Sequence, residues 1–164
     1  MNGESQKIRI IRLHKKWADF YTLLSQILII ALFVAVYFLS GVAKVRSPKG
    51  WAWASGSTLR EQVATDAIRK EVFGSEAPAL AGALYRSAGP LGALSAMALL
   101  VELGAPVALA GRRTGQVFAL AALGMHWGIR LSMGIRFTYN LSGFSYLPLF
   151  PVGRQLPPVS RLLP

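Results

Sequence analysis

The chain has 164 residues, of which 53% are hydrophobic and only 15% are charged, whereas a soluble domain usually carries about 25% charged residues. This composition excludes an ordinary water-soluble domain, and the absence of cysteine excludes disulfides, thiolate catalysis and cysteine-ligated metals. The net charge is +11, but the cations flank apolar runs, which indicates contact with anionic lipid headgroups and argues against a nucleic-acid partner.

Residues 1–20 are polar and basic, and the spacing of their apolar side chains predicts a short amphipathic helix on the membrane surface. Residues 21–43 contain no charged side chain. At 1.5 Å per residue this run gives roughly 35 Å of helix, which is enough to cross a bilayer. It is longer than the apolar core of a signal peptide, so we expect it to be a retained span.

Residues 45–87 form a long connection that opens with Trp51 and Trp53, side chains that favour the membrane interface. Thr58 and Glu61 have the spacing of a capping box, which predicts that a helix begins there. Over residues 58–73 the apolar residues follow one helical face. We expect this helix to lie flat on the bilayer or to cover the mouth of a cavity.

Two further spans are predicted at residues 88–110 and 116–139. Residues 141–152 are apolar but too short to cross, which indicates a re-entrant or interfacial segment, and the tail at 153–164 is rich in proline. The sequence therefore predicts an all-α membrane protein. Its membrane domain, residues 21–152, has three transmembrane helices, an interfacial amphipathic helix and a short C-terminal re-entrant or interfacial segment.

Basic residues are densest in the N-terminal segment and in the turn at Arg112 and Arg113. Because cytoplasmic loops carry the excess of lysine and arginine, this bias predicts a cytoplasmic N-terminus, in a bacterial plasma membrane. Lys44 then lies in the outer half of the membrane.

Glu102 stands inside an otherwise apolar predicted span, where a lone carboxylate costs several kcal/mol. It is either a structural contact between helices or a proton or substrate site. His126 and Arg130 share a helix face and lie at a similar depth to Glu102, so the three are predicted to form a cluster. His126 is also compatible with a hydrogen-bonded core histidine. No metal site is expected, since no second histidine lies in a span.

Lys44 and Arg136 fall at the opposite, outer end of the predicted spans. Each can simply extend its charge to the lipid headgroups. Alternatively, Arg136 lies beside Lys44, which then loses its proton more readily and acts as a general base. Tyr37, two turns before Lys44 on the same face, would extend a polar path inwards, and Asn140 would add an amide at this end.

The segment from Tyr37 to Leu59 reads YFLSGVAKVRSPKGWAWASGSTL. It resembles a signature of the vitamin K-dependent γ-carboxylase-like membrane family, also called HTTM-domain proteins, which has an aromatic pair, a small-Gly-apolar step, a lysine, and then tryptophan and glycine after a short turn. The matching positions are Tyr37, Phe38, Gly41, Lys44, Trp51 or Trp53, and Gly56. A later run, GMHWGIRLSMGIRFTYN, is similar to the family's histidine-bearing helix, with His126 and Phe137 in place. Glu102 corresponds to the acid of the preceding helix.

The resemblance covers about residues 20–150, and DoxX/MauE-like membrane proteins are more distantly similar. In the carboxylases the matching lysine deprotonates reduced vitamin K; the oxygenated quinone then takes a proton from a glutamate side chain, and carbon dioxide adds. The resemblance thus implies a base role for Lys44, supporting roles for Glu102 and His126, and a quinone as cofactor. Only twenty residues precede the first span and no large lumenal domain follows the third, which argues against full glutamate carboxylation.

Three classes of function remain open. The first is a membrane enzyme or enzyme subunit, half of a larger helical bundle, that acts on a quinone or a secreted peptide through Lys44. The second is a non-catalytic subunit of a larger complex, whose charged residues bind another membrane protein, lipid or pigment. The third is a small transporter or proton-conducting element built on Glu102 and His126. Because three spans enclose a ligand poorly, we expect a homo-oligomer or a partner protein. Arg130, Arg136, Tyr37, Asn140, Trp51 and Trp53 are the predicted binding residues.

Overall fold

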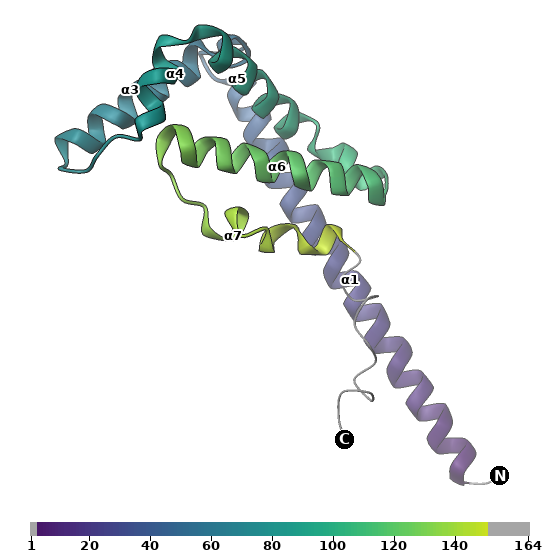
Figure 1. The fold of residues 1–164 in the computed structure, drawn as a ribbon. Helices are drawn as coiled ribbons and strands as arrows, with labels where there is room; N and C mark the ends of the chain where they lie inside the picture. Colours follow the sequence, from purple (N-terminus) through teal and green to yellow (C-terminus); the bar gives the residue numbers. More distant parts are fainter. Residues whose placement is uncertain (1–2, 151–164) are drawn as a thin grey trace.

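A computed structural model of the chain describes residues 3–150, and this part is helical with no strand. Figure 1 shows one very long helix crossed by shorter ones. In chain order the elements are α1 (Gly3–Arg46), α2 (Ala52–Ser55), α3 (Ser57–Val72), α4 (Ala79–Arg86), α5 (Ala88–Leu103), the 3₁₀ helix η1 (Ala105–Ala110), α6 (Arg112–Met133), α7 (Thr138–Leu141) and the 3₁₀ helix η2 (Phe144–Leu149). The predicted tail at 153–164 lies outside the described residues.

Helix α1 carries the predicted basic segment and the first predicted span as one continuous helix. The prediction of a separate helix over residues 1–20 is therefore wrong for residues 3–20, the part that the structure describes. Described side chains from Lys7 to Ile29 are exposed, and burial begins on one face at Val34, Tyr37 and Gly41. These positions follow the i, i+3, i+7 spacing of a helix face. The N-terminal half of α1 accordingly projects beyond the other helices (Figure 1).

The all-α prediction is confirmed, but three transmembrane helices are not. In residues 3–150 one helix, α1, is long and apolar enough to cross a membrane, or two if α4 and α5, which bend by 103° at their junction, count as one span. The second predicted span stops as an α-helix at Leu103, because Pro106 lacks an N–H for a regular helix. The third, α6, ends at Gly134, whose positive φ of 67° reverses the chain.

Helix α3 coincides with the helix predicted over residues 58–73, and its predicted position on a membrane surface stays a prediction. The predicted capping box is wrong. The N-cap is Gly56, with a positive φ of 83°, and no side chain caps the helix. Thr58 is buried instead, and the carboxylate of Glu61 forms an ion pair with Lys49.

Two apolar clusters hold the helices together. In the first, α1, η1, α6 and η2 meet around side chains that include Val34, Ala105, Phe118 and Tyr146. The second joins α3, α4, α5 and the end of α6, with Val63, Ala81, Leu84, Leu91 and Met133 at its centre. Helix α6 contributes to both, and in Figure 1 it lies across α1. The two clusters are therefore joined through α6.

The backbones of α1 and α5 come into close contact at Gly41. A Cβ atom placed there would lie 2.9 Å from Glu102 Cβ and 3.0 Å from the backbone nitrogen of Leu103. Real side chains do not tolerate such distances to a neighbouring backbone, so only glycine permits this approach. Gly41 therefore sets the distance between α1 and α5.

We expect Gly41→Ala to destabilise the protein by about 1–3 kcal/mol, the usual cost of forcing an atom into a packed contact. Gly124→Ala is the matched control, because Gly124 lies inside α6 and a Cβ there meets nothing within 4 Å. It should be neutral, or stabilising by up to about 1 kcal/mol through better helix propensity. Thermal unfolding of the detergent-solubilised variants measures both; equal stability would contradict the close approach.

Candidate functional site

A buried ion pair joins α1 to α5. The ammonium of Lys44 donates to Oε1 of Glu102, and the hydroxyl of Ser40, one turn earlier on α1, donates to the same oxygen at 3.3 Å. The side chain of Glu102 is 6% exposed and that of Lys44 is 26% exposed. Lys44 is thus the half of the pair that a molecule outside can reach.

The second carboxylate oxygen of Glu102 has no partner. Oε2 is buried, and no hydrogen-bond donor reaches it from the described residues. Buried polar atoms are nearly always hydrogen-bonded, and an unsatisfied one costs about 1–3 kcal/mol. An oxygen in this position is suited to take up a proton or to accept a hydrogen bond from a bound group.

Trp53 lies beside the ion pair. The Lys44 ammonium lies 5.1 Å from the centre of the Trp53 ring, a distance at which a cation is attracted to the face of an indole. Trp53 belongs to the short helix α2. The hydroxyl of Ser95 on α5 donates to the carbonyl of Trp53, which fixes α2 against α5. Trp51, the other predicted tryptophan, is 66% exposed and takes no part in the site.

A second polar group surrounds the phenol of Tyr37, two turns before Lys44 on α1. The Tyr37 and Tyr146 oxygens are 3.0 Å apart, and Asn140 Nδ2 donates to them at 3.1 and 3.4 Å respectively. His126 Nδ1 lies 3.3 Å from each phenol oxygen. Four side chains from α1, α6, α7 and η2 thus share one hydrogen-bonded network in the protein interior.

The backbone determines which ring nitrogen of His126 carries the hydrogen in the neutral form. Nδ1 lies 2.8 Å from the carbonyl oxygen of Ala122, and a carbonyl can only accept. Nδ1 therefore carries the hydrogen, which leaves Nε2 of the neutral ring as an acceptor. The edge of the ring packs against Phe137 at 5.0 Å between centres. The predicted reading of His126 as a hydrogen-bonded core histidine fits this arrangement.

The polar residues of α1 face inwards in one line. Tyr37, Ser40 and Lys44 follow the i, i+3, i+7 spacing of a single face. Ser40 and Lys44 contact Glu102, whereas Tyr37 contacts the histidine network, and no described hydrogen bond joins the two groups. They are adjacent polar groups and not one continuous path.

The predicted cluster of Glu102, His126 and Arg130 is wrong. Arg130 is partly buried on α6, with its guanidinium 5.6 Å from the Trp127 ring, and forms no described ion pair with Glu102. The 3₁₀ helix η1 separates α5 from α6, and the described partners of Glu102 come from α1, whereas His126 contacts Tyr37, Tyr146 and the Ala122 carbonyl.

The predicted neighbours of Lys44 are also wrong. Arg136 is exposed and lies in the segment after α6, with no described contact to Lys44, whose charged neighbour is the carboxylate of Glu102. Asn140, predicted near Lys44, binds the two phenols instead. The electrostatic partner of Lys44 is thus an anion where the sequence predicts a cation.

Two features of the site escape the sequence patterns. Tyr146 lies in a Pro-containing apolar run that carries no periodic signal, and Ser40 is one of several small residues in a long apolar helix.

A separate buried carboxylate, Asp66, binds Arg69 and Lys70 on α3, and Lys70 also donates to the carbonyl of Met133 at the end of α6. This second carboxylate serves to join α3 to α6.

Comparison with models of protein families, with curated proteins and with solved structures finds no match to this chain. The resemblance seen in the sequence therefore stays a prediction.

We expect Lys44→Ala to cost about 3–5 kcal/mol of stability, because it leaves the Glu102 carboxylate buried without its cation. Replacing both residues by leucine should recover most of that loss, since two apolar side chains need no partner. Lys49→Ala is the matched control in the exposed Lys49–Glu61 pair and should cost at most about 1 kcal/mol. Thermal unfolding in detergent compares them; equal effects of the two single variants would contradict burial of the Lys44 pair.

We expect Tyr37→Phe to destabilise the protein by about 1–3 kcal/mol, because Asn140 and Tyr146 lose a buried partner. Tyr139→Phe removes the same hydroxyl from a ring that is 71% exposed and should leave stability unchanged. Chemical denaturation of the two variants distinguishes these outcomes, and an undiminished Tyr37→Phe protein would argue against the network.

Proposed function

We propose that this chain is a subunit of an integral membrane protein that binds a reduced quinone within the bilayer and moves a proton through Lys44 and Glu102. The unsatisfied Oε2 of Glu102 is the observation that carries the proposal, because it provides a buried acceptor next to an accessible amine. The resemblance to the γ-carboxylase-like family, which implies a base role for Lys44 toward a hydroquinone, agrees with it.

The balance of two electrostatic effects allows the proton to move. Coulomb attraction favours the charged pair, whereas removal of both groups from water favours the neutral amine and carboxylic acid. In a low-dielectric site these effects are comparable in size. A proton that passes along the hydrogen bond from Lys44 to Oε1 of Glu102 leaves a neutral amine at the accessible side, and this amine can accept the hydroxyl proton of a hydroquinone.

The surroundings of Lys44 favour a flat, lipid-soluble ligand. Trp53 presents an aromatic face beside the ammonium, and the outward residues of α1 near this end are apolar, with Val36 67% and Leu39 62% exposed. A quinone ring can stack on the indole while one of its oxygens contacts Lys44. An exported peptide is the other substrate class that the resemblance implies. Its polar backbone matches an apolar surface of this kind less well.

The proposal describes a subunit because the apolar surface of α1 has no cover within the described residues. Ile27, Leu28 and Leu32 are each more than half exposed. Lipid covers such residues in a membrane, and one or two crossing helices do not by themselves enclose a ligand. We therefore propose a second copy or another membrane protein as the partner, in a bacterial plasma membrane with the N-terminus in the cytoplasm.

Binding of menadiol to the purified protein in nanodiscs tests this function, with tryptophan fluorescence as the signal. We expect quenching that Trp53→Phe removes and Trp51→Phe retains, because only Trp53 lies beside Lys44. Lys44→Ala should weaken binding about tenfold, which corresponds to about 1.4 kcal/mol. Lys44→Arg should bind but not take up a proton, because an arginine stays charged.

Lys49→Ala is the control and should bind menadiol as the unchanged protein does. Full binding and proton uptake in both Lys44 variants would refute the proposal. Absence of menadiol binding, together with purification in a large stable assembly, would favour the non-catalytic subunit. Proton flux through vesicles that stops in Glu102→Gln without any quinone would favour the proton-conducting element.

A further inference from the structure

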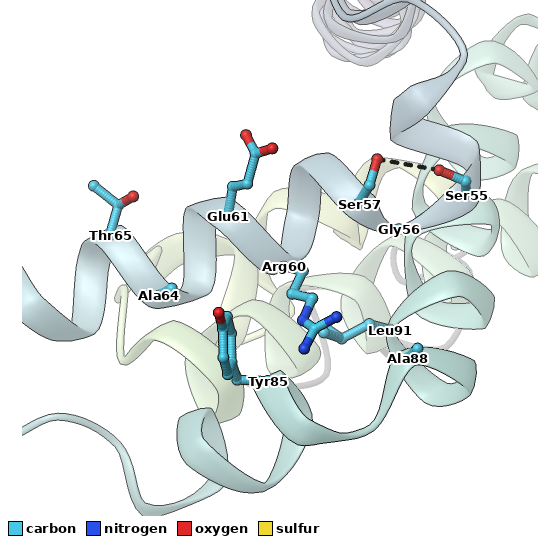
Figure 2. A pocket seen from close by; sticks show the side chains of 10 residues that line it. All are labelled: Ser55, Gly56, Ser57, Arg60, Glu61, Ala64, Thr65, Tyr85, Ala88 and Leu91. Atoms are coloured by element: carbon cyan, nitrogen blue, oxygen red, sulfur yellow. Dashed lines mark hydrogen bonds between the residues drawn. The ribbon is translucent and has the colours of Figure 1, made fainter.

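A cavity of about 560 Å³ lies between α3 and the hairpin of α4 and α5, away from Lys44 and Glu102. Figure 2 shows it from close by. Its wall is formed by Ser57 and Arg60 on α3, by Tyr85 on α4, and by Ala88 and Leu91 at the beginning of α5. Neither of the polar groups described above extends into it.

Arg60 enters this cavity without a partner. Its guanidinium carbon lies 4.5 Å from the centre of the Tyr85 ring, and its Nε is buried with no hydrogen-bond acceptor. Among the side chains that the structure describes, no carboxylate lies within ion-pair distance of Arg60. A partly desolvated guanidinium without an anion is costly, and its planar fork of donors matches two oxygens of a phosphate.

The rest of the wall adds donors on one side and an apolar surface on the other. The Ser55 and Ser57 hydroxyls lie 3.2 Å apart beside the cavity, but both donate to the Ala52 carbonyl, so the donors on this side are backbone N–H groups. Helix α3, sixteen residues long, begins here with no side-chain cap, so its first-turn N–H groups add a positive field. Glu61 also borders the cavity, but Figure 2 shows it pointing away from Arg60, and its carboxylate pairs with Lys49.

We propose that this cavity binds a phosphate group, with Arg60 as the bidentate donor held in place by Tyr85. The volume exceeds what one phosphate needs, and Ala88 and Leu91 offer an apolar floor for the remainder of the ligand. The headgroup of an anionic lipid and a soluble phosphate compound share this chemistry. The inference does not depend on the quinone function, because it uses different residues.

The test uses the full chain in nanodiscs of phosphatidylcholine, with or without phosphatidylglycerol, and native mass spectrometry of the retained lipid. A second arm titrates inorganic pyrophosphate into the detergent-solubilised protein by calorimetry. We expect binding in one arm, weakened about tenfold by Arg60→Gln and severalfold by Arg60→Lys, since lysine keeps the charge but loses the fork. Retention of phosphatidylglycerol identifies a lipid source, and pyrophosphate binding alone identifies a soluble one.

Arg86→Gln is the matched control, because this arginine is exposed at the end of α4 and does not line the cavity. It should bind either probe as the unchanged protein does. Equal losses in Arg60→Gln and Arg86→Gln would show a general charge effect and overturn the proposal, as would failure of both probes to bind. If Arg60→Gln does not fold, Arg60→Lys decides: affinity equal to that of the unchanged protein would also overturn it.

Discussion

The contact between α1 and α5 at Gly41 brings together Lys44 and Glu102, the two residues of the candidate site. Because no side chain separates the two backbones, Lys44 reaches Glu102 one turn from the contact and removes it from water. A carboxylate as buried as Glu102 is tolerated only with a cation beside it. The ion pair and the close approach therefore require each other, and the face of α1 that also carries Tyr37 is turned inwards as a consequence.

The two polar groups on this face differ in their hydrogen-bond balance. Around Tyr37, the two phenol oxygens, Asn140 Nδ2 and His126 Nδ1 each have at least one hydrogen-bond partner, and the network joins α1, α6, α7 and η2. At Glu102 one oxygen is satisfied and the other is not. Polar atoms that all have partners suit a structural role, whereas an acceptor without a partner beside a partly exposed ammonium suits chemistry. This difference, more than the residue types, makes Lys44 and Glu102 the candidate site.

The sequence predicts the local features well. The absence of charge from residues 21–43 predicts a long apolar helix, and periodicity predicts a helix near residues 58–73; both appear in α1 and α3. Lys44, Glu102, Tyr37, His126, Asn140 and Trp53 are singled out because polar side chains in or beside apolar runs are costly. Several partners assigned to them are wrong, because no local pattern shows that Lys44 on α1 and Glu102 on α5 meet where the two helices touch.

Composition and hydrophobic pattern by themselves determine the all-helical class, the long apolar helix and the identity of the costly polar residues, because each follows from local chain physics. Only the tertiary structure decides that Glu102 pairs with Lys44, that His126 joins two tyrosines, and that Arg60 lies in a cavity without an anion. These pairings join residues far apart in the chain. The first two depend on the packing of α1 against α5 and α6, and the third on the packing of α3 against α4 and α5, which no sequence period records.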